Sequence, residues 1–182
     1  MFCILQTLKL PAKSWCLHIG AGELEEMETY NKLRVKPVWV EARPQAVTDA
    51  KCTWPFQKII QACVSNETGK VVKFCEARDG NKSSLCVDSG VPLRGYRHMR
   101  TITVTDLLSS NKIPEDQFTL LVISTEGTEL AILNTISEKM CTCLQAAIIS
   151  FHNESQRKSI DEVLGCLFDN TFTLEQWVVG HK

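Results

Sequence analysis

Short apolar runs alternate along the chain with stretches whose apolar residues recur at helical spacing. The runs that predict strands buried on both faces are residues 15–19, 38–40, 59–64, 118–123 and 144–151. The stretches that predict amphipathic helices are residues 22–33, 44–51, 126–140 and 155–168. This alternation favours an α/β fold with a mostly parallel sheet and helices on both faces, a doubly wound Rossmann-like arrangement.

The remaining elements are shorter. Residues 71–77, 101–104 and 174–179 predict further strands, and 79–84 predict a turn. Residues 126–140 give the clearest helix, whose Leu130, Leu133, Ile136 and Met140 should face the sheet. Because no repeat, low-complexity segment or linker interrupts this pattern, a single domain over residues 1–182 is expected.

Composition narrows the class of partner. The chain of 182 residues carries a formal net charge of −1, which argues against nucleic acid as its main partner. One basic cluster, formed by Arg94, Arg97, His98 and Arg100, is typical of a solvated face. The apolar runs are far shorter than the ~20 residues of a membrane span, and the N-terminal residues lack the pattern of a signal peptide. We therefore expect a cytoplasmic protein without membrane association.

The number and placement of the cysteines agree with a cytoplasmic location. The nine cysteines are odd in number and scattered, and Cys63 and Cys166 lie inside apolar runs. This distribution indicates free thiols in a reducing environment. Cys141 and Cys143 form a C-x-C pair without a partner pair at zinc spacing, so no metal site is expected.

The first candidate for chemistry is the turn at residues 18–22, whose sequence is His-Ile-Gly-Ala-Gly. In doubly wound sheets, ligands bind beyond the carboxyl ends of the strands, where this turn should lie. Gly20 and Gly22 would allow a tight bend and a close approach of a ligand to the backbone. An ordinary structural bend explains the same residues equally well.

Glu41 favours the functional interpretation. It closes the predicted strand at 38–40, about 20 residues after the turn, where an acidic side chain can bind both ribose hydroxyls. Ala42 follows it and joins the same candidate cofactor site. A surface carboxylate at a strand end is the alternative. Together, the turn and Glu41 favour a cofactor that contains ribose.

Polar residues also follow two later strands. Ser124 and Thr125 lie between the strand at 118–123 and the helix at 126–140, and Glu126 and Glu129 lie in the first turn of that helix. Helix capping and the helix dipole alone would explain these residues. His152 directly follows the strand at 144–151, where it could act as a general base or simply cap the strand. His152 is therefore one candidate catalytic residue.

The order of these segments resembles that of one known family. The run IGAGELEEMETYNKLRVKPVWVEARPQAV and the later run LLVISTEGTELAIL are similar to segments of FkbM-type methyltransferases. The similarity extends through residues 62–65, 80–85 and 102–108 and spans about 15–152. It implies a class I fold that binds S-adenosylmethionine and methylates a hydroxyl group, often that of a sugar.

The resemblance also implies roles for individual residues. Gly20, Ala21 and Gly22 would face the methionine part of the cofactor, and Glu41 would hold its ribose. Ser83 and Ser84 match a serine pair of the family, and Glu126 and Glu129 match its acidic positions. The resemblance thereby makes Glu126 the second candidate catalytic residue, beside His152. This chain has His18 and Ser124 where the family usually has Asp, and Leu24 where it often has Gly. His18 and Ser124 are therefore assigned to the surroundings of the cofactor.

Two hypotheses follow for the function. The first is an S-adenosylmethionine-dependent O-methyltransferase that acts on a carbohydrate or another small hydroxylated acceptor. The second is a catalytically degenerate relative that acts as a binding module, which His18 and Ser124 motivate. A nicotinamide oxidoreductase is less favoured because Glu25 stands at the third glycine position of G-x-G-x-x-G. The sequence leaves the acceptor and homo-oligomer formation open.

Overall fold

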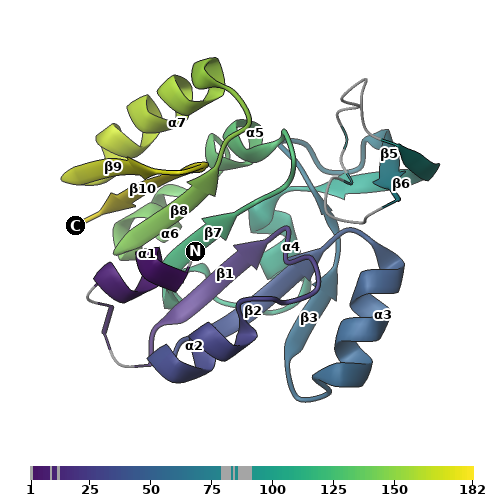
Figure 1. The fold of residues 1–182 in the computed structure, drawn as a ribbon, viewed down its shortest axis with the longest axis horizontal. Coiled ribbons are helices and arrows are strands. Elements are labelled where there is room, and N and C mark those ends of the chain that lie inside the picture. The colour runs from purple at the N-terminus through teal and green to yellow at the C-terminus, as the bar shows by residue number, and fades with distance from the viewer. Residues whose placement is uncertain (1, 9, 12, 79–82, 84, 86–91) are drawn as a thin grey trace.

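A seven-stranded sheet forms the centre of the computed structural model, which describes residues 2–8, 10–11, 13–78, 83, 85 and 92–182 (Figure 1). Its strands are, in spatial order, β3 (Lys58–Gln61), β2 (Lys36–Glu41), β1 (Trp15–Ile19), β7 (Phe118–Ile123), β8 (Ala146–Ser150), β10 (Trp177–His181) and β9 (Asn170–Leu174). The first five strands are parallel, whereas β10 runs antiparallel to both β8 and β9. The predicted α/β class with a mostly parallel sheet is confirmed.

Helices cover both faces of this sheet. On one face lie α1 (Phe2–Thr7), α2 (Met27–Leu33) and α3 (Pro44–Thr53). On the other lie α4 (Val104–Ser110), α5 (Glu129–Leu133), α6 (Glu138–Cys143) and α7 (Glu154–Leu167). A short 3-10 helix, η1 (Glu115–Gln117), precedes β7. None of the helices in the described part of the chain is long and apolar enough to span a membrane.

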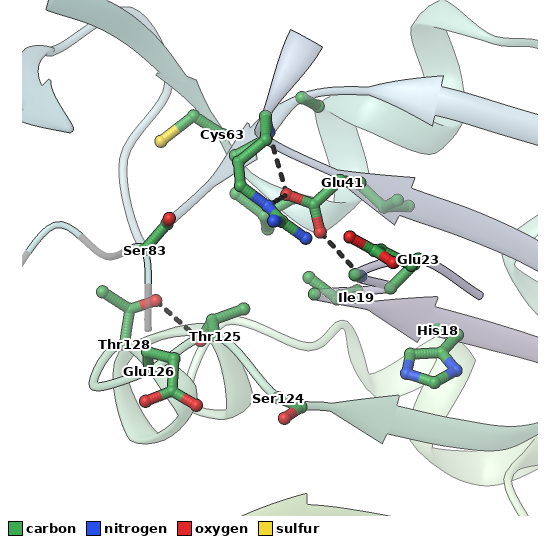
Figure 2. A pocket seen from close by; sticks show the side chains of 18 of the residues that line it. His18, Ile19, Glu23, Glu41, Cys63, Ser83, Ser124, Thr125, Glu126 and Thr128 are labelled. Atoms are coloured by element: carbon green, nitrogen blue, oxygen red, sulfur yellow. Dashed lines mark hydrogen bonds and ion pairs between the residues drawn. The ribbon is translucent and has the colours of Figure 1, made fainter. Parts of the chain in front are cut away.

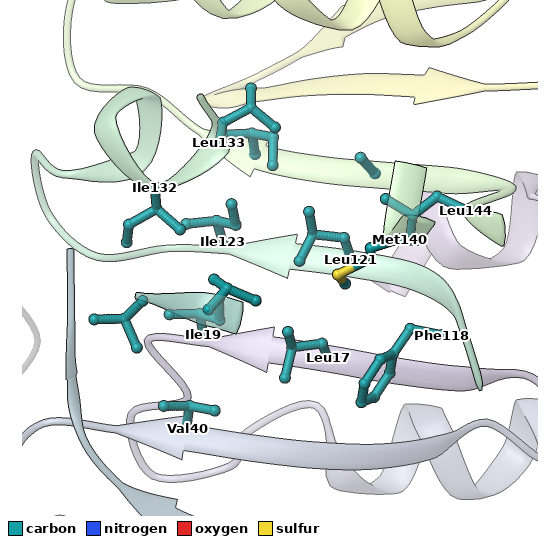
Figure 3. Close-up of a cluster of buried hydrophobic side chains, with 14 of the residues drawn as sticks. Leu17, Ile19, Val40, Phe118, Leu121, Ile123, Ile132, Leu133, Met140 and Leu144 are labelled. Atoms are coloured by element: carbon teal, nitrogen blue, oxygen red, sulfur yellow. The ribbon is translucent and has the colours of Figure 1, made fainter. Parts of the chain in front are cut away.

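The strand residues alternate between two apolar clusters. Leu17, Leu121 and Ile123 pack against α4–α7, as Figure 3 shows for the central strands. Cys16, Leu120 and Val122 point to the opposite face and pack against α1–α3. Burying one such aliphatic side chain contributes about 1.5–3 kcal/mol, so both faces stabilise the sheet. The seven cysteines whose side chains the structure describes are all free thiols.

A smaller sheet interrupts the alternation between β3 and β7. It has the order β4-β6-β5, with β4 (Cys63–Val64) parallel and β5 (Val71–Ala77) antiparallel to β6 (Leu93–Ile102). Figure 1 shows the β5–β6 ribbon beyond the carboxyl ends of β1, β2 and β3. The predicted strand at 59–64 is therefore wrong as one element, because β3 and β4 belong to different sheets. The predicted strand at 101–104 is also displaced, since β6 ends at Ile102 and Thr103 caps α4.

Two predicted helices are shorter than their apolar pattern suggests. The helix at 22–33 begins only at Met27, because Gly22 and Leu24 have φ angles of 56° and 62° that an α-helix cannot contain. The helix at 126–140 divides into α5 and α6: Glu126 has φ 57°, and Ser137 starts a new helix by accepting from the Met140 amide. Its apolar side chains still pack against the sheet.

The two ends of the chain add elements that the pattern did not predict correctly. The single strand predicted at 174–179 is a hairpin, in which β9 and β10 pair antiparallel. At the other end α1 buries Ile4 and Leu5 against the α1–α3 face. Other predictions hold closely: the strand at 118–123 coincides with β7, and the helix at 155–168 corresponds to α7.

Candidate functional site

A cavity of about 270 Å³ opens at the carboxyl ends of the parallel strands. Its wall includes the turn after β1, the end of β2, the loop after β7 and the start of β10, and Phe74 of the β5–β6 ribbon closes one side. This is the position at which doubly wound sheets bind their ligands. The described candidate residues on this wall are His18, Gly20, Ala21, Gly22, Glu41, Ala42, Ser83, Ser124 and Glu126.

The glycine turn is shaped by a contact between two strand ends. Gly20 has φ 82°, and a Cβ at this position would lie 1.8 Å from the carbonyl oxygen of Ser124. The Ser124 amide in turn donates to the Ile19 carbonyl at 2.9 Å. Only glycine fits between these backbones, so the turn brings the ends of β1 and β7 together at the base of the cavity.

Glu41 is buried beneath this turn, with 6% of its surface exposed. Its Oε2 accepts from the Gly22 amide at 2.7 Å, and its Oε1 accepts from the Arg43 amide at 2.8 Å and from Arg43 Nε at 3.1 Å (Figure 2). The carboxylate therefore joins the end of β2 to the glycine turn. Each carboxylate oxygen can accept about two hydrogen bonds, so Oε2 keeps capacity for a ligand hydroxyl.

His18 lies at the inner end of the cavity and is almost fully buried. Its Nδ1 is 3.0 Å from the Tyr30 hydroxyl, and its ring centroid lies 5.0 Å from that of Trp39. Burial lowers the pKa of His18 to about 3, so the ring is neutral at physiological pH. A neutral imidazole thus stands where the resembling family usually has a carboxylate.

The loop after β7 is held by Glu129, whose side chain is fully buried. The carboxylate accepts from the amides of Thr125 and Gly127 and from side chains of three residues beyond the loop. Those donors are Ser150 Oγ (3.2 Å), His152 Nε2 (3.2 Å) and Gln156 Nε2 (2.8 Å). Glu129 thus fixes the loop to the end of β8 and the start of α7.

The pKa of Glu129 reflects these contacts. Burial alone raises the pKa, but hydrogen bonds from His152 and from the Glu129 and Gly127 amides, together with the charge of His152, bring it to about 2. The carboxylate is therefore ionised over the whole physiological range. The sequence indicated only an acidic residue in the first turn of a helix, because its other partners lie 21–27 residues further along the chain.

The two candidate catalytic residues have different positions. Glu126 lines the cavity, with its side chain 32% exposed (Figure 2). His152 is not among the described residues that line the cavity; its ring lies between Glu126 Oε2, 3.7 Å from Nδ1, and Glu129. Of the two candidates, Glu126 is therefore the one that lines the cavity.

Only one member of the predicted serine pair is among the described residues. Ser83 lies on the cavity wall and accepts from the Ala77 amide at 3.0 Å. Ser84 falls outside the described residues. Ala42 follows Glu41 on the wall, and the neighbouring Ala62 amide donates to the Glu41 carbonyl at 3.0 Å.

The charge of the cavity is negative. Five carboxylates line it, those of Glu23, Glu25, Glu26, Glu41 and Glu126. Arg43 is the one Lys or Arg among the described lining residues, and it is engaged by Glu41. Such a wall favours a ligand with positive charge and disfavours phosphate groups.

Comparisons with known proteins show similarity in structure but not in sequence. No protein-family model matches the chain, and neither does any curated protein. Among solved structures, the chain resembles the methyltransferase FkbM from Methylobacillus flagellatus KT, with a TM-score of 0.61 and 12% identity. The alignment covers 97% of this chain and 45% of that one, so the chain spans less than half of this relative.

Two further structures share the arrangement. The TehB-like SAM-dependent methyltransferase from Corynebacterium glutamicum aligns with 100% of this chain and 86% of its own, with a TM-score of 0.51 and 13% identity. The alignment with the precorrin-6y C5,15-methyltransferase from Geobacter metallireducens GS-15 covers 100% of this chain and 87% of that one, with a TM-score of 0.53 and 10% identity. The fold is therefore the Rossmann-like fold of SAM-dependent methyltransferases, and the resemblance inferred from the sequence is confirmed at the level of the fold.

Proposed function

We propose that the chain binds S-adenosylmethionine in the cavity beyond β1, β2 and β7 and transfers its methyl group to a hydroxyl of a small or carbohydrate acceptor. One observation carries the proposal: the buried carboxylate of Glu41 is tied to the Gly22 amide at the end of β2. In this fold an acidic residue at that position can bind both ribose hydroxyls.

The charge of the cavity supports this cofactor over a dinucleotide. S-adenosylmethionine carries a positive sulfonium, which five lining carboxylates would stabilise. The pyrophosphate of a nicotinamide cofactor would instead meet those carboxylates, and no unpaired Lys or Arg lies among the described residues of the wall. The glycine turn, with the first helical residue only at Met27, also lacks the helix N-terminus that binds pyrophosphate directly after G-x-G-x-x-G.

The residues around the acceptor side support transfer to a hydroxyl. A bound cofactor would supply an electrophilic methyl group, and the protein would mainly position the two reactants. Glu126 is the carboxylate that could take the proton of the attacking hydroxyl. His152 would hold Glu126 in place through its Nδ1, while Glu129 fixes His152 from behind.

The alternative is a binding module that keeps the cofactor but not the reaction. Ser124 supports it, because a hydroxyl stands in the cavity where the resembling family usually has a carboxylate. In that case Glu41 and the glycine turn would bind the cofactor as above. Only turnover separates the two candidates.

Calorimetry tests the proposal directly. S-adenosylmethionine, S-adenosylhomocysteine and NAD⁺ are titrated into the protein at the same ionic strength. We expect the two adenosyl-amino acid compounds to bind and NAD⁺ to give no heat. Absence of heat from both adenosyl-amino acid compounds contradicts the proposal. Binding without methyl transfer to any of a panel of hydroxylated acceptors favours the binding module.

A further inference from the structure

A second cavity of about 240 Å³ adjoins the first. Glu23, Arg43 and Ser83 line both cavities, so the two are neighbours across these residues. The second cavity extends from this shared wall between the start of α3 and the end of the β5–β6 ribbon. A molecule bound there would lie next to a cofactor in the first cavity.

Arg78 and Arg94 project from the ribbon into this second cavity. Arg78 directly follows β5, and its amide donates to the Pro92 carbonyl, which brings it near Arg94 at the start of β6. Within the described part of the chain, neither guanidinium has a hydrogen bond or an ion pair. Both side chains are exposed and available to a ligand.

Two of the three acidic residues of this cavity are already engaged. Glu76 forms an ion pair with Arg97 at 2.6 Å, and Asp49 accepts from Gln45 Nε2 at 2.8 Å. Glu23 lies at the junction with the first cavity. Among the residues that the structure describes, neither guanidinium is paired with any of the three carboxylates in this wall.

The surrounding segment is basic. Residues 70–102 contain seven Lys or Arg but only three Asp or Glu. The whole chain, by contrast, has 20 Lys or Arg and 21 Asp or Glu. The ribbon is thus positive in a protein of slightly negative charge. Its potential would attract anionic molecules to the edge of the cofactor cavity.

We propose that the second cavity is the subsite for an anionic group of the acceptor, which Arg78 and Arg94 bind, while the acceptor hydroxyl extends into the adjoining first cavity, which Glu126 lines. Guanidinium groups bind carboxylate and phosphate through paired, charge-assisted hydrogen bonds. The chemical class is a hydroxylated small molecule with a carboxylate or phosphate, such as a uronic acid or a sugar phosphate. Its role in methyl transfer rests on the proposed function, whereas anion binding does not.

The test uses pairs of probes that differ only in charge. Methyl β-glucuronide is compared with methyl β-glucoside, and glucose 6-phosphate with glucose, by NMR titration in the presence of S-adenosylhomocysteine. We expect one anionic probe to bind at least tenfold more tightly than its neutral counterpart. The probe that binds identifies the source of the charge as carboxylate or phosphate.

Variants assign the effect to the two arginines. The double substitution R78Q/R94Q should remove the preference for the anionic probe and leave affinity for S-adenosylhomocysteine within twofold. R100Q is the matched control, because it removes the same charge from the same strand about 20 Å from Arg94. It should leave the preference unchanged. Far-UV circular dichroism checks that both variants fold.

Three results would overturn the proposal. The first is that the wild type binds the charged and neutral probes equally, or binds neither. The second is that R78Q/R94Q keeps the preference for the anionic probe, and the third is that R100Q loses this preference to the same extent, which would indicate only the general charge of the ribbon. Failure of S-adenosylhomocysteine to bind is a separate outcome. It would contradict the proposed function, while the response of the anionic probes to R78Q/R94Q would still decide the subsite.

Discussion

The backbone of Gly20 packs directly against the carbonyl of Ser124, so closely that a Cβ at Gly20 would lie 1.8 Å from that oxygen. This contact joins the ends of β1 and β7, the two strands that carry the centre of the cavity. The φ angle of 82° at Gly20 adds a second reason for glycine, because other residues are strained there.

Gly20→Ala should therefore destabilise the protein by at least about 3 kcal/mol, from steric overlap and left-handed strain together. Chemical denaturation followed by circular dichroism measures the loss. Gly165→Ala is the control, since Gly165 lies in α7 with open space around its Cα, and alanine there should stabilise the helix by about 0.5–1 kcal/mol. Equal stabilities of the two variants would contradict the close contact.

Substitution of Glu129 should reveal how strongly its carboxylate holds the loop after β7. Glu129→Gln replaces an acceptor of five donors by an amide that can accept fewer, and we expect a loss of roughly 3 kcal/mol at pH 7. Glu154→Gln is the control, because Glu154 is 63% exposed and its pair with Arg157 contributes little.

The pH dependence of this difference follows from the pKa of Glu129. The folded-state pKa of about 2 lies below the ordinary value of 4.5, so the carboxylate stabilises the fold above pH 4.5. That stabilisation is lost as the pH falls through 2. The wild type should therefore lose most of its advantage over Glu129→Gln between pH 5 and 2. A stability difference between the wild type and Glu129→Gln that stays constant over this pH range would contradict the lowered pKa of Glu129.

His18 should affect stability in a higher pH range. Its folded-state pKa of about 3 lies below the ordinary value of 6.5, so between these values only the unfolded chain binds the proton. The free energy of unfolding should be highest above pH 6.5 and should fall as the pH decreases toward 3. His18→Asn should lack this decline, as measured by urea denaturation at several pH values. A wild type whose stability is flat between pH 6.5 and 5 would argue against a buried neutral His18.

Leu24 offers a test of backbone strain. Its φ of 62° is left-handed, while its side chain is buried with 2% exposed. Both Leu24→Ala and Leu24→Gly lose that burial, at a cost of about 2–5 kcal/mol. Because only glycine relieves the strain, Leu24→Gly should be about 1 kcal/mol more stable than Leu24→Ala, the reverse of the usual order. A less stable glycine variant would contradict the left-handed conformation.

The central strands were predictable because they are buried on both faces. The run at 118–123 coincides with β7, and those at 15–19 and 144–151 match β1 and β8 closely. The spacing between the glycine turn and Glu41 also predicted correctly that they would meet. These features depend on local composition and on the general geometry of parallel sheets.

Other features depend on contacts between distant residues. The apolar spacing of 126–140 could not show that Glu126 adopts a left-handed conformation while Glu129 binds the loop amides. The hairpin of β9 and β10 follows from pairing with β8, which no local pattern indicates. The sequence placed His18 beside the glycine turn, but it could not show that the ring is neutral, because that state depends on burial against Tyr30 and Trp39.

The central claim is that Glu41 and the glycine turn bind the adenosyl part of a cofactor. The most direct measurement is the affinity for S-adenosylhomocysteine, by calorimetry, of the wild type, Glu41→Ala and Glu28→Ala. Glu28 is an exposed residue of α2 that pairs with Lys32 at the surface, so it serves as the control. We predict binding by the wild type and Glu28→Ala and at least tenfold weaker binding by Glu41→Ala. Equal affinities in all three proteins, or no binding by the wild type, would contradict the claim.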